Sequence, residues 1–68
     1  MVVDVRDMLC AQALAVVAQA VAMLARGAVV AVRYNALDVK HDLLVWARDQ
    51  GHRAREPDAA TLLIEKAT

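Results

Sequence analysis

The chain contains few of the residues that disulfide-rich or aromatic-rich folds depend on. It has one cysteine, one proline, two glycines, one tryptophan, one tyrosine and no phenylalanine in 68 residues. One cysteine cannot form a disulfide within the chain, which excludes a disulfide-dense secreted scaffold and favours a reducing, cytoplasmic compartment. Because aromatic residues are scarce, the core must be built from Val, Leu, Ile, Met and Ala. The length allows a single domain.

An excess of charge of either sign is also absent. Eight Lys and Arg residues balance eight Asp and Glu residues. Recognition of phosphates needs a net basic surface, so we expect no direct binding to nucleic acid. No Gly-rich phosphate loop, Ser-His-Asp set or zinc-ligand spacing is present, so we expect no cofactor and no metal.

One uncharged run, residues 8–25, approaches the length of a membrane span. A span needs about 20 predominantly apolar residues, but this run contains seven alanines and is interrupted by Gln12 and Gln19. Acidic residues precede the run, whereas a signal peptide begins with basic ones. We therefore expect a soluble helix and no membrane partner, and a membrane-associated helix is the minority alternative.

Local patterns predict the element order β-α-β-α-β-β. Apolar or β-branched runs predict strands at residues 1–5, 28–34 and 61–66, and a weaker, polar strand at 52–56. The run 28–34 is apolar on both sides, which is typical of a strand in the middle of a sheet. Pro57 and Asp58 predict the turn before the last strand. Right-handed crossovers then give an α/β (α+β) two-layer sandwich, with a four-stranded mixed sheet and two helices on one face.

The two helices are predicted from apolar residues that recur every three or four positions. Leu14, Val17 and Val21 lie in such a stripe within residues 11–26, and a similar stripe lies within residues 35–50. Gly27 and Gly51 follow the two helices and suit C-terminal caps. At residue 35 an asparagine suits the N-cap of the second helix, with Asp38 supporting its first turn.

The only cysteine lies where the first strand passes into the first helix. If the first two strands are parallel, both helices begin at the same end of the sheet, with Cys10 at one opening and residues 35–41 at the other. A helix N-terminus presents unpaired N–H groups and a partial positive charge, so we expect it to lower the pKa of a thiol there. Arg6 could add a second positive charge, whereas the carboxylate of Asp7 would oppose the anion. The alternative is that Cys10 is a small buried apolar residue.

Two runs in the chain resemble motifs of a known family. The first is Val3-Asp4-Val5-Arg6-Asp7-Met8-Leu9-Cys10-Ala11-Gln12-Ala13; the second is Asp42-Leu43-Leu44-Val45-Trp46, followed by Gly51-His52. They resemble the Leu-Asp-x-Arg-Gly-Leu-x-Cys-Pro-x-Pro signature and the later Asp-Ile-x-x-Trp and Gly-His motifs of the TusA-like (SirA-like) small sulfur carriers. The resemblance covers nearly the whole chain, and the family has the same element order.

The resemblance implies a sulfur carrier of the sulfurtransferase type. Cys10 would accept sulfane sulfur as a persulfide from a donor protein or a small donor, and pass it to an acceptor protein of a sulfur relay. Arg6 would stabilise the thiolate. Contacts with partners are expected around the two helix starts, at Asp4, Arg6, Asp7, Asn35, Lys40 and His41. We expect a monomer or a weak dimer.

The chain departs from the family signature at three positions. Ala11 and Ala13 replace both prolines, and Asp7 replaces the glycine. Ala is an excellent helix former, so the helix can also begin earlier and draw Cys10 into its first turn. The runner-up hypothesis is therefore a non-catalytic binding or regulatory module of the same fold, in which Cys10 is only structural.

Overall fold

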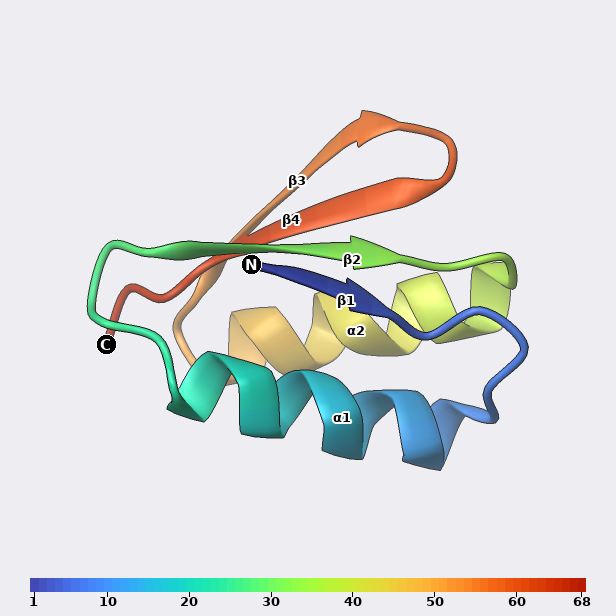
Figure 1. Cartoon of the computed structure of the whole chain (residues 1–68), viewed down its shortest axis with the longest axis horizontal. Helices are drawn as coiled ribbons and strands as arrows, with labels where there is room; N and C mark the ends of the chain where they lie inside the picture. Colours follow the sequence, from blue (N-terminus) through green and yellow to red (C-terminus); the bar gives the residue numbers. More distant parts are fainter.

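The computed structural model describes residues 1–68 and contains four strands and two helices. Their bounds are β1 Val2–Asp4, α1 Cys10–Ala22, β2 Val29–Arg33, α2 Leu37–Asp49, β3 Arg53–Asp58 and β4 Thr61–Glu65. The sheet has the strand order β1-β2-β4-β3, and both helices cover the same face of it (Figure 1). The predicted two-layer sandwich with a mixed sheet is confirmed.

The sheet is mixed because only its first pair of strands is parallel. β1 runs parallel to β2, with Val3 opposite Val32, whereas β4 is antiparallel to both β2 and β3. The parallel pair makes α1 and α2 begin at the same end of the sheet, as expected. The loops that follow β1 and β2 therefore meet at that end.

The core lies between the helices and the inner face of the sheet. It contains twelve buried residues, none of them charged: Val5, Ala13, Val17, Val21, Val30, Val32, Tyr34, Val39, Leu43, Ala47, Leu62 and Ile64. The alternating burial of β2 and β4 places every second residue in this core. Only one buried side-chain polar atom, the Tyr34 hydroxyl, has no hydrogen-bond partner.

Helix α1 begins earlier and ends earlier than residues 11–26. Cys10 is its first residue, as expected when alanines replace the family prolines. The helix ends at Ala22, and just beyond it Lys66 Nζ donates to the carbonyl oxygen of Leu24 at 3.0 Å. Gly27 is therefore not a helix cap. It lies at φ +89° in the turn closed by the bond from the Ala28 amide to the Ala25 carbonyl.

Helix α2 has an unexpected start and the expected end. Its N-cap residue is Ala36, and no side chain caps it, so the prediction of Asn35 as N-cap is wrong. At the other end Gly51 has φ +79°, and the amide of His52 donates to the carbonyl of Ala47 at 2.8 Å. Together with the bond from the Gly51 amide to Arg48, this forms a Schellman motif.

The hairpin between β3 and β4 turns two residues later than predicted. β3 continues through Pro57 to Asp58, with a register irregularity between Arg55 and Asp58. The turn consists of residues 59–60, where a side-chain oxygen of Asp58 accepts a bond from the Ala60 amide at 2.8 Å. An edge strand tolerates a proline because its outer N–H positions need no partner. Neither helix is long and apolar enough to cross a membrane.

Candidate functional site

Cys10 lies on the first turn of α1 at the edge of the core. Its side chain is half-buried and packs against the core, and the thiol is free. The preceding residue, Leu9, is extended and 79% exposed, and no side chain caps the helix. The first amides of α1 therefore have no side-chain acceptor. Ala11 keeps its N–H, which adds one donor that a proline at this position would lack.

Two carboxylates of α2 dominate the electrostatics of the thiol. Asp42 is the larger influence: its carboxylate favours the protonated thiol, and this raises the pKa of Cys10. Desolvation and the negative charge of Asp38 add to the effect, so that the pKa of Cys10 rises from 9.0 to about 11. The expectation of a lowered pKa is wrong, because the charges brought in by the second helix outweigh the dipole of the first.

A raised pKa keeps the thiol protonated at neutral pH. With a pKa of about 11, roughly one thiol in ten thousand is ionised at pH 7. The nucleophilic form is the thiolate, so the resting thiol is protected against adventitious oxidation and alkylation.

Asp7 and Asn35 join the loops that precede the two helices. The amide of Asp7 donates to Asn35 Oδ1 at 3.0 Å, and Asn35 Nδ2 donates to Asp7 Oδ1 at 2.7 Å. Asp7 has φ +65°, a left-handed conformation that favours glycine and that aspartate tolerates better than most residues. Both side chains are therefore engaged in a structural clamp beside Cys10, and the carboxylate of Asp7 faces the amide of Asn35.

Arg6 pairs with Asp4. Its Nη2 lies 2.7 Å from Asp4 Oδ2, and its Nε lies 3.0 Å from Asp4 Oδ1. The guanidinium lowers the pKa of Asp4 to about 2, and the carboxylate raises the pKa of Arg6. Arg6 is not among the groups that perturb Cys10. The structure therefore directs Arg6 to Asp4, and a role for it in stabilising the thiolate remains a prediction.

The two remaining predicted contact residues lie on α2. His41 is exposed, and Lys40 Nζ forms an ion pair with Glu56 of β3 at 2.8 Å. This pairing raises the pKa of Lys40. Lys40 thus ties α2 to the sheet, whereas the side chain of His41 is free for contact.

The candidate site consists of Cys10 with Asp38 and Asp42 of α2. The hydrogen-bonded pair of Asp7 and Asn35 lies in the loops that precede the two helices. Sequence analysis assigned Asp38 to the first turn of α2 and named Asp42 only as part of a motif, so it missed the position of both carboxylates near the thiol. Their spacing of four residues puts them on one helix face, and parallel strands bring that face towards Cys10. No group of three or more His, Cys, Asp or Glu side chains has the arrangement of a metal site.

Comparison with known proteins leaves the chain without a matched relative. No protein family model, no curated protein and no solved structure matches it.

Proposed function

We propose that the protein is a sulfur carrier in which Cys10 holds sulfane sulfur as a persulfide. The observation that carries the proposal is the position of Cys10. Its half-buried thiol begins α1 at the end of the sheet where α2 also begins. A sulfur there can be approached by a partner protein, because the thiol lies at the edge of the core and not inside it.

The conformation of Asp7 supports the resemblance that underlies the proposal. The family signature has glycine at this position, and the backbone here adopts φ +65°, the region that glycine occupies freely. The loop thus has the geometry for which the family uses glycine, although the residue differs. The free thiol at the start of the helix also suits a reducing compartment, and we place the protein in the cytoplasm on that ground.

The transfer step requires Cys10 to lose its proton as it attacks. The Cys10 sulfur bonds to the terminal sulfur of a donor persulfide, and the donor's own S–S bond breaks. The donor leaves as a thiolate and takes up the proton that Cys10 loses. Sulfane sulfur moves between two thiols without net oxidation. In the reverse sense, the loaded Cys10 delivers the same sulfur to an acceptor thiol.

The raised pKa of Cys10 favours a second candidate function. A thiol with a pKa of about 11 is a weak nucleophile near neutral pH. Under this reading the protein is a non-catalytic binding or regulatory module, and Cys10 contributes only packing at the edge of the core. The two candidates differ in whether the folded protein can be loaded with sulfur.

The test is the intact mass of the protein after incubation with polysulfide or thiosulfate, before and after a reductant. A carrier gains the mass of a sulfur atom, loses it on reduction, and gains nothing as Cys10→Ser. No gain in the native chain, with slow alkylation of Cys10 at every pH below its pKa, would favour the binding module.

A variant that restores the family prolines provides a further comparison. Ala11→Pro and Ala13→Pro together rebuild the Cys-Pro-x-Pro motif. Proline is tolerated at Ala11 in the first turn of α1, whereas at the buried Ala13 it removes the bond from that amide to the Leu9 carbonyl at 2.9 Å, so Ala11→Pro alone is measured beside the double variant. If the variant is loaded and the native chain is not, the loss of the prolines accounts for the loss of activity. Equal loading would show that the alanines leave the carrier step intact.

A further inference from the structure

The sheet has a second face that no helix covers. Both helices lie on one side of the sheet, so the residues that alternate with the core point to the other side (Figure 1). The strand register places them in cross-strand rows. One row contains Val29, Glu65 and Arg53, and the next contains Ala31, Leu63 and Arg55. We call these six residues the open face.

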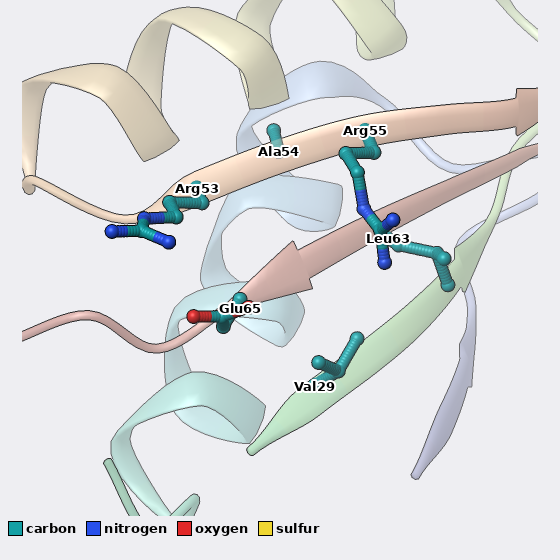
Figure 2. A pocket seen from close by; sticks show the side chains of 6 residues that line it. All are labelled: Val29, Arg53, Ala54, Arg55, Leu63 and Glu65. Carbon is teal, nitrogen blue, oxygen red and sulfur yellow. The ribbon is translucent and has the colours of Figure 1, made fainter. Parts of the chain in front are cut away.

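The open face is hollowed and partly apolar. A shallow hollow of about 460 Å³ is lined by Val29, Leu63 and the arginines of β3 (Figure 2). Val29, Ala31 and Leu63 are only partly covered, although they lie on the central strands. An apolar strip of this kind, rimmed by charged residues, is typical of an interaction surface.

The arginines on this side of the sheet form no ion pair, although Arg33 stands opposite Asp4 and helps to lower the pKa of that carboxyl. The structure contains two ion pairs, Arg6 with Asp4 and Lys40 with Glu56. Arg33, Arg53 and Arg55 are exposed and take part in neither. Arg53 stands opposite Glu65 in the register, yet no ion pair forms between them. Figure 2 shows Arg55 extending towards Leu63, which places a guanidinium beside the apolar strip.

We propose that the open face docks an acidic segment of a partner protein, in which carboxylates alternate with apolar side chains. The carboxylates would pair with Arg53 and Arg55, where the planar guanidinium favours bidentate contacts. An apolar side chain would enter the hollow against Val29 and Leu63.

The open face is separate from Cys10. Cys10 lies on the helix side, at the end of the sheet where β1 finishes, whereas the hollow lies on the other side, beside the start of β2. A partner docked there would leave the thiol accessible to a second protein. The docking proposal therefore does not depend on the proposed sulfur chemistry, and the two can fail independently.

Two other occupants fit the charges less well. Nucleic acid needs a net basic surface, and Glu65 lies inside the hollow of a chain whose formal net charge is zero. A second copy of the chain would offer one carboxylate, Glu65, to the two arginines Arg53 and Arg55 across a symmetric interface, so one guanidinium of each copy would stay without a partner. An acidic, apolar segment satisfies both the guanidinium groups and the hollow.

The test is an NMR titration of the isotope-labelled full chain with a short synthetic peptide that alternates Glu and Leu. We expect shifts of the amides of β2, β3 and β4 around Ala31 and Leu63, and none at Cys10. A peptide that alternates Lys and Leu should not bind. Replacing Arg53 and Arg55 by Gln together should weaken binding about fivefold, as expected for two exposed ion pairs. A double variant of equal charge, Arg26→Gln with Arg48→Gln, lies outside the open face and should bind like the native chain.

Several results would overturn the proposal. They are equal binding of the two peptides, shifts confined to the helix side, or equal weakening by both double variants. Tighter binding of a single-stranded oligonucleotide than of the Glu-Leu peptide would assign the face to nucleic acid. Concentration-dependent shifts on the open face without peptide would assign it to a second copy of the chain.

Discussion

Replacing Asp42 by Asn should make Cys10 more reactive. Asp42 is the largest cause of the rise in the pKa of Cys10 from 9.0 to about 11. A change of this size lowers the thiolate fraction at pH 8 by roughly a hundredfold relative to an ordinary thiol. Because Asn keeps the size of Asp and removes its charge, the variant should recover much of this difference. We expect Asp42→Asn to react with iodoacetamide about tenfold faster at pH 8.

The assay measures the alkylation rate as a function of pH by intact mass. The native chain should show a midpoint near 11, and the midpoint of Asp42→Asn should move towards 9.0. The control is Asp49→Asn, which removes the same charge at the far end of α2 and should react like the native protein. A midpoint near 9.0 in the native chain, or a midpoint that does not change in Asp42→Asn, would refute the assignment of Asp42 as the main cause of the raised pKa of Cys10.

Four further predictions follow from single contacts. The carboxyl of Asp4 should titrate near 2 by carbon NMR and move towards 3.8 in Arg6→Gln. Its lowered pKa stabilises the fold above pH 3.8, and this contribution should be lost as the pH falls towards 2. Asp7→Ala should lower the free energy of unfolding by about 2 kcal/mol in urea titrations, because alanine is strained at φ +65° and the contact with Asn35 is lost. Asp7→Gly should lower it by less, because glycine adopts this φ without strain. Tyr34→Phe should leave the free energy of unfolding unchanged or raise it by about 1 kcal/mol, since the buried hydroxyl has no hydrogen-bond partner. A clear decrease in the free energy of unfolding would show that the hydroxyl does form a hydrogen bond. Leu43→Ala should lower the free energy of unfolding by roughly 2–5 kcal/mol, because the side chain is fully buried, and a loss under 1 kcal/mol would contradict the described core.

Much of the fold can be predicted from the sequence because its periodic signals are local. The stripe through Val17 and Val21 defines the buried face of α1, and the apolar run of β2 defines an interior strand. Gly51 marks the end of α2 because only a residue that tolerates positive φ completes that cap. The end of α1 could not be predicted in this way. No glycine or proline lies at residues 23–25, directly after the helix, so no local signal marks this end.

The site was less predictable because it depends on contacts between segments far apart in sequence. Asn35 has the composition of an N-cap, but its side chain instead bonds to Asp7 across the two loops. Cys10 could be placed at the start of a helix from the sequence alone. The sign of its pKa shift could not, since that depends on how closely Asp42 and Asp38 of the second helix approach the thiol.

The measurement that tests the central claim most directly is the release of sulfur from the loaded protein to cyanide. Cyanide removes sulfane sulfur as thiocyanate and restores the thiol, so it counts transferable sulfur rather than oxidised cysteine. The proposed function predicts one equivalent of thiocyanate per chain after loading, and none from Cys10→Ser. No thiocyanate from the native chain, or equal amounts from both proteins, would contradict the assignment of Cys10 as the sulfur carrier.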